Sequence, residues 1–301
     1  MVWVLAFVAV LVLYLIYISR PDRMIRSTIV LAERTCRKMD WQDAAKSYRV
    51  AHAVAGRLKE PVKSQVESQI EIQWAGVLYR QGQMGEAEDL LRRGLVKARC
   101  HLSPESGFLM QGELYWGDLC TDMGRHGEAE QHYRKAHEGD EQRGNLAGVV
   151  FALQKLGDSL ICQERRGDAE SEIRRAIDIE TRVVHEQLRR DGKDPAEHPI
   201  ISMNQPDLYF CREQYEDARP LYRAKVEYWA GQAARPANID LGRLQMRLAI
   251  AEAQTGHLAD AIEMYGRAEA TFRREWCDEH PRTVAAREAK AALSREIERA
   301  G

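Results

Sequence analysis

The 301-residue chain is close to neutral, with 44 lysines and arginines against 46 aspartates and glutamates. A formal charge of −2 excludes the broad basic face that nucleic-acid binding needs in order to displace counterions from phosphates. Hydrophobic residues make up 45% of the chain, which is enough apolar mass for a continuous core. The six cysteines form no CxxC pair, a pattern typical of buried residues in a reducing compartment rather than of a disulfide framework.

An uncharged segment opens the chain, because residues 2–18 read VWVLAFVAVLVLYLIYI. As a helix rising about 1.5 Å per residue it spans about 25 Å, slightly less than a hydrocarbon core of about 30 Å. Arg20, Arg23 and Arg26 follow it, and the positive-inside rule then places the rest of the chain in the cytoplasm. The competing interpretation is a cleaved signal peptide. It needs a basic n-region and a small-residue cleavage site, and this segment has neither. The sequence therefore predicts a transmembrane signal-anchor helix over residues 1–19, with membrane contact through residues 2–18, in a single-pass membrane protein.

A charged sequence motif that contains a central alanine recurs along the remaining chain: GEAEDLLRRG at residues 85–94, GEAEQHYRKA at 127–136 and GDAESEIRRA at 167–176. Equivalent alanines, which we call the anchors, follow one another at intervals of 43, 42, 40, 49 and 43 residues. The anchors are Ala44, Ala87, Ala129, Ala169, Ala218 and Ala261. Twelve residues before them lie Ala32, Ala75, Gly117, Gly157, Pro206 and Ala249. Four residues after them lie Tyr48, Leu91, Tyr133, Ile173, Tyr222 and Tyr265.

Small residues at two fixed positions, with a bulky residue beside them, indicate a helix–turn–helix unit that is stacked several times. Two helices approach closely only where both present small side chains, and the bulky side chain fills the space beside the crossing. The turn falls in segments such as RQGQMGEA and DMGRHGEA, where glycine can end the first helix in a left-handed conformation. One such pair cannot bury its apolar face alone, so the pattern predicts neighbouring pairs stacked into a solenoid.

This spacing resembles the tetratricopeptide repeat (TPR). The interval near 42 residues, and the EHP triplets at 197–199 and 279–281, are similar to the kinesin-light-chain type of that repeat. The resemblance implies an all-α fold: six TPR-like helical hairpins over residues 20–280 in a right-handed superhelical solenoid, preceded by the single transmembrane helix. A capping helix is expected over residues 281–301. Repeat five departs from the pattern at Gln205, Pro206, Pro220 and Lys225, and a kink or loosened joint is expected there.

Proteins of this shape bind extended peptides or partner helices along a concave face lined by the first helix of each unit, and the resemblance implies the same for this chain. Eleven residues before the anchors lie Glu33, Gly76, Asp118, Asp158, Asp207 and Ile250. Four of these six are acidic, which favours a basic, amphipathic protein or peptide partner. The alternative is that the acids are solvated or paired with nearby arginines. The predicted partner-binding groove consists of Glu33, Tyr79, Arg80, Asp118, Asp122, Phe151, Asp158, Asp207 and Phe210.

Catalytic and metal-binding patterns are weak. Cys277 and His280 make a CxxH half-site, but a zinc site needs about four ligands and no second half-site has matching spacing. The sequence has no Gly-rich phosphate loop, HExxH or GxSxG motif. We therefore expect no catalytic residue, metal, cofactor or small-molecule substrate, and a non-enzymatic, membrane-anchored scaffold or adaptor. The alternatives are an exported periplasmic repeat protein of envelope assembly and a receptor of the mitochondrial-import type.

Overall fold

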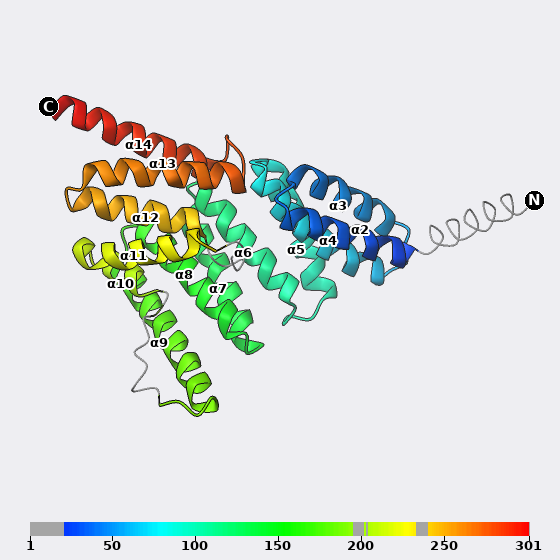
Figure 1. Cartoon of the computed structure of the whole chain (residues 1–301). Helices are drawn as coiled ribbons and strands as arrows, with labels where there is room; N and C mark the ends of the chain where they lie inside the picture. The colour runs from blue at the N-terminus through cyan, green and yellow to red at the C-terminus, as the bar shows by residue number, and fades with distance from the viewer. Residues whose placement is uncertain (1–20, 195–201, 203, 233–239, 301) are drawn as a thin grey trace, which may run out of the picture. The chain divides into compact units, whose positions relative to one another are not determined.

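The computed structural model describes residues 21–194, 202, 204–232 and 240–300 (Figure 1). Regular structure in these ranges is α-helical. In chain order the helices are α2 Pro21–Arg37, α3 Trp41–Ala55, α4 Val62–Arg80, α5 Met84–His101, α6 Gly107–Asp122, α7 His126–Gln142, α8 Leu146–Cys162, α9 Arg166–Arg190, α10 Gln205–Cys211, α11 Tyr215–Ala230, α12 Leu241–Gln254, α13 Leu258–Glu275 and α14 Pro281–Ala300.

Every hairpin turn in the described ranges is closed by the same helix cap. One residue of each turn has a positive φ, and the N–H of the next residue donates to a carbonyl five residues earlier, as Gln83 does to Leu78 and Arg125 does to Cys120. This is the Schellman arrangement, which satisfies carbonyls left open at a helix end. Gly144 and Gly192, which follow α7 and α9, also have a positive φ, and the six positive-φ residues of the turns inside the repeats are Met39, Gly82, Gly124, Glu164, Glu213 and Gly256. Each of these six lies five residues before an anchor alanine, so the repeat interval measured in the sequence is the interval between these caps.

The anchors and their small partners lie where helices cross. All six anchor alanines are fully buried, as are Ala32, Ala75 and Ala249. At Gly117 a Cβ atom would lie 2.5 Å from the ring of Tyr133, and at Gly157 it would lie 2.9 Å from Ile173. Real Cβ atoms do not approach so closely, so glycine is needed for the α6–α7 and α8–α9 crossings. The bulky residue four positions after the anchor therefore packs on the small residue of the preceding helix.

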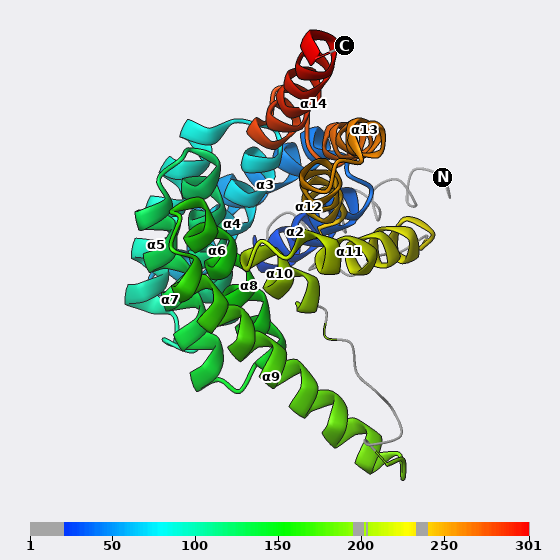
Figure 2. The same cartoon turned by 90° about the vertical axis from the view of Figure 1, so that its left-hand side faces the viewer.

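The chain divides into two compact units, residues 1–115 and residues 116–301, with the boundary inside α6. We describe each unit by itself and call them unit 1 and unit 2. In unit 1, α2 packs on α3, α3 on α4, and α4 on α5. In unit 2 the same succession runs from α7 to α14, with α14 packed on α13. Figure 2 shows α9 continuing beyond the helices that it packs against.

Repeat five has an unusual shape in unit 2. Its first helix, α10, is only 7 residues long, whereas the preceding helix, α9, has 25 residues. Pro206 lies in the first turn of α10, where a missing N–H costs no intrahelical hydrogen bond. Pro220 lies inside α11, and the helix nevertheless continues to Ala230. Residues 195–201 and 203, which precede α10, lie outside the described ranges.

The predicted membrane anchor requires a correction. Residues 1–19, on which that prediction rests, lie outside the described residues. Among residues 21–194, 202, 204–232 and 240–300, no helix has both the length and the apolar character needed to cross a bilayer. This finding contradicts the predicted single-pass membrane localisation with the repeats facing the cytoplasm.

Candidate functional site

Unit 1 contains a pocket of about 300 Å³, and most of its lining residues lie on the first helices of the hairpins. Its walls come from α2, α3, α4 and the part of α6 that belongs to this unit. The lining residues are Glu33, Cys36, Arg37, Trp41, Tyr48, Gln73, Gly76, Val77, Arg80 and Tyr115. The volume lies at the lower end of the range for small-molecule pockets and is sufficient for one large side chain.

Arg80 is held in place inside this pocket by an aromatic environment. Its guanidinium carbon lies 5.4 Å from the centroid of the Trp41 ring and 5.6 Å from that of Tyr115, both within cation–π range. One Nη donates a hydrogen bond of 2.9 Å to the carbonyl of Gly76. Gly76 itself is required by Tyr115, because a Cβ atom at position 76 would lie 2.6 Å from that ring. The guanidinium is thus fixed before any ligand arrives.

A short series of hydrogen-bonded side chains fixes the part of the pocket wall that α4 and α6 form. Gln73 Nε2 donates to Gln111 Oε1 at 2.6 Å, and Gln111 Nε2 donates to the hydroxyl of Tyr115 at 2.9 Å. Because each partner holds the next, the Tyr115 ring that contacts Arg80 has a defined orientation. The pocket wall is therefore preorganised from α4 to α6.

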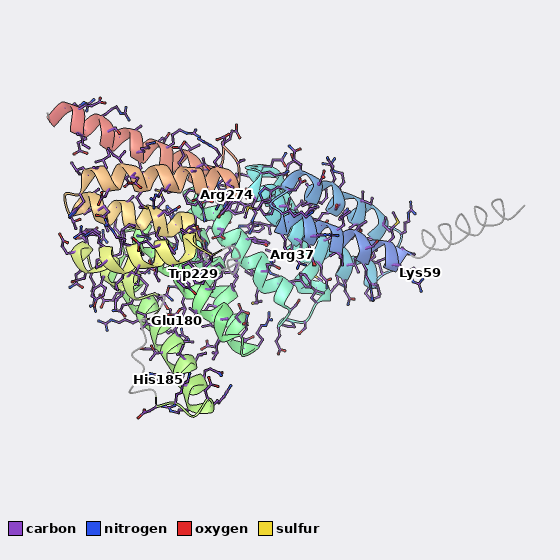
Figure 3. The ribbon with its side chains drawn as sticks, viewed as in Figure 1. Arg37, Lys59, Glu180, His185, Trp229 and Arg274 are labelled. Atoms are coloured by element: carbon purple, nitrogen blue, oxygen red, sulfur yellow. The ribbon has the colours of Figure 1, made fainter. Side chains whose placement is uncertain are left out.

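Two further charged side chains line the pocket from α2. Arg37, labelled in Figure 3, and Glu33 are exposed, and neither has a hydrogen-bond or ion-pair partner in the part of the chain that the structure describes. The charged lining is therefore two guanidinium groups and one carboxylate. Burial raises the pKa of the Cys36 thiol, which keeps this pocket residue protonated at neutral pH.

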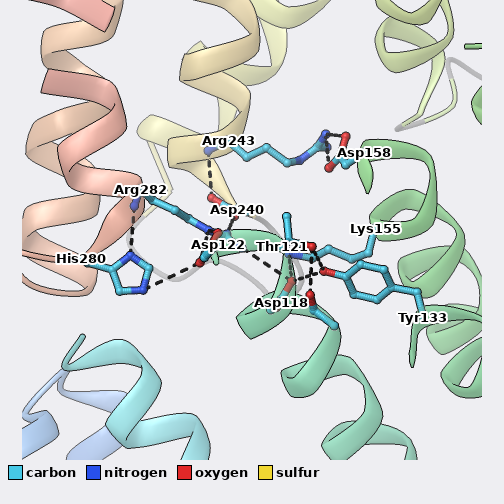
Figure 4. A network of polar contacts seen from close by, with 11 residues as sticks. Asp118, Thr121, Asp122, Tyr133, Lys155, Asp158, Asp240, Arg243, His280 and Arg282 are labelled. Atoms are coloured by element: carbon cyan, nitrogen blue, oxygen red, sulfur yellow. Dashed lines mark hydrogen bonds and ion pairs between the residues drawn. The ribbon is translucent and has the colours of Figure 1, made fainter. Parts of the chain in front are cut away.

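The acidic residues predicted to line the groove in unit 2 form ion pairs with basic side chains of the same unit (Figure 4). The Asp118 carboxylate accepts from Tyr133 Oη at 2.9 Å and from Lys155 Nζ at 3.0 Å. Arg282, at the start of α14, lies 3.6 Å from the same carboxylate and 3.0 Å from that of Asp122. The acids of α6 are therefore neutralised by one lysine of α8 and one arginine of α14.

A second group of contacts joins α8 and α10 to α12. Asp158 is 3.2 Å from Arg243 and 2.8 Å from Arg247. Asp207 is 3.1 Å from Arg243 and accepts a 2.5 Å hydrogen bond from Tyr222 Oη. The five side chains are between 0 and 18% exposed, so these pairs are largely removed from solvent.

Asp240 connects the two groups. It caps the N-terminus of α12, where its carboxylate accepts from the backbone N–H of Arg243 at 2.9 Å. Its other oxygen lies 3.0 Å from Arg282. Five carboxylates of unit 2 thus form ion pairs with the same four cations, Lys155, Arg243, Arg247 and Arg282. We call these carboxylates the acidic column: Asp118, Asp122, Asp158, Asp207 and Asp240.

These partners set the pKa values of the column. Burial alone would raise the pKa of Asp118, but the nearby Lys155 and Arg282 outweigh it and leave the pKa below its ordinary value. The pKa of Asp207 is likewise lowered against the effect of burial, chiefly by Arg243. Burial would lower the pKa of Arg243, yet Asp158 and Asp207 raise it well above the ordinary value. Asp118 and Asp207 are therefore ionised and Arg243 is charged throughout the neutral range.

The residues of the predicted groove fall into three environments. Glu33 and Arg80 line the pocket of unit 1, whereas Tyr79 is only 2% exposed and is absent from the pocket lining. Asp118, Asp122, Asp158 and Asp207 form the column of unit 2. Two aromatic residues lie beside this column. The ring centroid of Phe151 is 5.4 Å from Lys155 Nζ, and that of Phe210 is 4.2 Å from the Arg247 guanidinium carbon.

Sequence reasoning missed Trp41 and Tyr115 in unit 1. For unit 2 it gave pairing of the acids with arginines as an alternative but did not identify Arg243, Arg247 and Arg282. A partial signal existed for unit 1, because repeat two has Gly76 at the position that is acidic in repeats three to five. No such signal marks Arg282, which is separated from Asp122 by 160 residues.

The residues of the CxxH half-site take part in packing and local hydrogen bonding. His280 is fully buried, its ring lies 4.1 Å from that of Trp276, and the hydroxyl of Thr283 donates to the Cys277 carbonyl at 2.8 Å. Over the described ranges, no group of three or more histidine, cysteine, aspartate or glutamate side chains is arranged to hold a metal ion.

The arrangement of stacked helical hairpins defines an all-α, TPR-like helical-repeat fold, and the solved structures that resemble the chain include TPR-like repeat proteins. A Rap protein complexed with Competence and Sporulation Factor aligns with 93% of this chain and 79% of its own, at 13% identity and a TM-score of 0.55. Aspartyl phosphate phosphatase F from Bacillus subtilis aligns with 91% of this chain and 71% of its own, at 12% identity and a TM-score of 0.55.

At these identities the likeness shows the fold alone. A putative kinesin light chain from Podosopora anserina with nearly identical TPR-like repeats has a TM-score of 0.48 at 14% identity, over 85% of this chain and 97% of its own. No protein-family model matches the chain, and no curated protein matches it either.

Proposed function

We propose that the protein is a helical-repeat adaptor whose pocket in unit 1 receives an acidic side chain of a protein or peptide partner. TPR-like repeat proteins generally mediate interactions between proteins, and the Rap protein of this fold was solved as a complex with Competence and Sporulation Factor. The observation that carries the proposal is Arg80, which is held against Trp41 and Tyr115 inside a cavity of about 300 Å³.

The chemistry of the pocket favours a carboxylate. A guanidinium group presents its N–H donors in a rigid fork that matches the two oxygens of a carboxylate, and a preorganised fork loses little entropy on binding. Arg37 adds a second guanidinium, and Glu33 is the single opposing charge in the lining. The rings of Trp41, Tyr48 and Tyr115 supply apolar contact for the atoms that flank the carboxylate. A glutamate or aspartate next to an apolar residue, in an extended segment, fits this lining.

This chemistry differs from the basic partner expected from the acidic column. The basic partner stays a prediction, because its proposed contacts, Asp118, Asp158 and Asp207, are paired with cations of unit 2. The pocket of unit 1 instead includes Arg37, whose guanidinium has no hydrogen-bond or ion-pair partner among the residues that the structure describes. We therefore assign the first contact with a partner to unit 1.

A selection of random peptides displayed on phage, with the full chain as bait, tests the proposal. We expect enrichment of acidic peptides, with affinity at least about tenfold lower for Arg80→Ala, since a charge-assisted bidentate contact contributes about 1.5–3 kcal/mol. Arg80→Lys keeps the charge but not the planar fork and should restore only part of the affinity. Arg93→Ala, at an exposed arginine of α5 in the same unit, is the matched control. Selected peptides whose binding is the same for wild type, Arg80→Ala and Trp41→Ala would refute the assignment.

A further inference from the structure

The ion pairs of unit 2 connect helices that are not neighbours in the order of the repeats. Arg282 at the start of α14 reaches Asp118 and Asp122 in α6, and Arg247 in α12 reaches Asp158 in α8. In an ordinary solenoid each repeat contacts only the next one, so its ends do not meet. These pairs tie the last helices of unit 2 back to its first ones.

The pairs are buried enough for their loss to matter. The carboxylate of Asp207 is 4% exposed, Asp122 is 7% exposed, and the three arginines are between 12 and 16% exposed. Removing one member of a buried pair is strongly destabilising, because it leaves the other charge uncompensated in a low-dielectric environment. Arg282 also contacts three carboxylates at once, so its removal affects Asp118, Asp122 and Asp240 together.

We infer that Arg243, Arg247 and Arg282 form a clasp that holds α12 and α14 against α6 and α8 and closes the acidic column to basic partners. The clasp is an autoinhibitory contact built into unit 2. Basic segments reach the column only when these three arginines are withdrawn from it. The inference uses only residues of unit 2, so it stands independently of the pocket proposed in unit 1.

The packing of α14 makes Arg282 the place where the clasp can open. Beyond the Arg282 contacts, α14 is supported by α13, through Ala286 in a cluster with Ala268 and Phe272. Its outer face carries exposed residues such as Arg295, which donates to the carbonyl of Ala291 in its own helix. The α13–α14 packing does not depend on Arg282, so release of Arg282 leaves that contact in place.

A charge exchange in the full chain tests the clasp. Hydrogen exchange followed by mass spectrometry should show amides of α12 and the first turns of α14 exchanging about 10- to 100-fold faster in Arg282→Glu than in wild type. The double variant Asp122→Arg/Arg282→Glu restores an opposite-charge pair and should return exchange toward the wild-type rate. Arg295→Glu is the matched control on the exposed face of α14 and should leave exchange unchanged.

A second measurement uses a fluorescein-labelled peptide of alternating arginine and alanine. We expect no saturable binding to wild type and saturable binding to Arg282→Glu that is lost in the double variant. Should Arg282→Glu fail to fold, recovery of its helical circular dichroism by Asp122→Arg supports the clasp, and failure to recover overturns it. Unchanged exchange in a folded Arg282→Glu, or equal peptide binding by wild type, would also overturn it, whatever the pocket of unit 1 binds.

Discussion

At the scale of single residues, Lys225 is the clearest departure from the repeat pattern. It lies seven residues after an anchor, where the other repeats have Ala51, Gly94, Ala136, Ala176 and Ala268. Its amine has no hydrogen-bond or ion-pair partner within the described ranges. Burial lowers its pKa from 10.5 to about 8, despite the opposing attraction of Asp207. A lysine therefore replaces a packing residue at a cost in stability.

Replacing Lys225 with methionine keeps the aliphatic stem and removes this cost. Below about pH 8 the amine is charged in both the folded and the unfolded chain, so wild type has the full penalty. Between pH 8 and 10.5 the unfolded chain binds more protons, so the free energy of unfolding of wild type rises with pH. We expect Lys225→Met to be more stable at neutral pH by on the order of 1–2 kcal/mol, a value reduced for partial solvation.

Denaturant unfolding at a series of pH values checks this expectation. The advantage of Lys225→Met should shrink as the pH passes from about 8 toward 10.5. Lys135→Ala, at an exposed lysine on α7, should show no such pH dependence. An advantage of Lys225→Met that grew with pH would contradict the assignment of a depressed pKa.

At the scale of elements, the short helix α10 depends on Asp207 for its attachment. This carboxylate is bonded to Tyr222 of α11 and paired with Arg243 of α12, so one side chain joins three helices. Only seven residues long, α10 has little helical stability of its own. Its position is therefore set by these polar contacts together with the apolar packing of Phe210 on Tyr222 and Leu244.

The variant Asp207→Asn should lose about 3 kcal/mol or more of unfolding free energy at neutral pH, because Arg243 loses a buried partner. The folded-state pKa of Asp207 lies well below its ordinary value of 3.8. Its contribution is therefore fully present above about pH 4 and disappears as the pH falls toward the folded-state pKa. Thermal unfolding between neutral and acidic pH should show the two proteins converging on acidification. An unchanged difference at low pH would contradict the role of the Asp207 charge.

At the scale of the whole molecule, the hairpins were predictable because their signals are local. The anchor alanines, the small residues twelve positions earlier and the glycine turns all fall within one repeat, and the structure places them at helix crossings and Schellman caps. The occupants of the acidic column were not predictable. A contact such as Arg282 with Asp122 depends on how several hairpins curve in succession, and no local spacing records that curvature.

The two units thus differ in how the charged side chains on the first helices of their hairpins are paired. In unit 2 five carboxylates are shared among four cations, whereas the pocket of unit 1 combines Arg80 with Arg37, which has no ion-pair partner among the described residues. This contrast leads to the central claim, that the first partner contact is made by a carboxylate in unit 1. Membrane attachment plays no part in it.

Disulfide exchange at Cys36, which lines the pocket, tests that claim most directly. The full chain with Cys100 and Cys162, its exposed cysteines, replaced by serine would be equilibrated with two disulfide reagents of equal size, one ending in a carboxylate and the other in an ammonium group. Intact-mass measurement should find the carboxylate reagent preferred on Cys36 by about tenfold, with the preference lost in Arg80→Ala and no labelling of this site in Cys36→Ser. Equal labelling by both reagents, or preference for the ammonium group, would contradict the account.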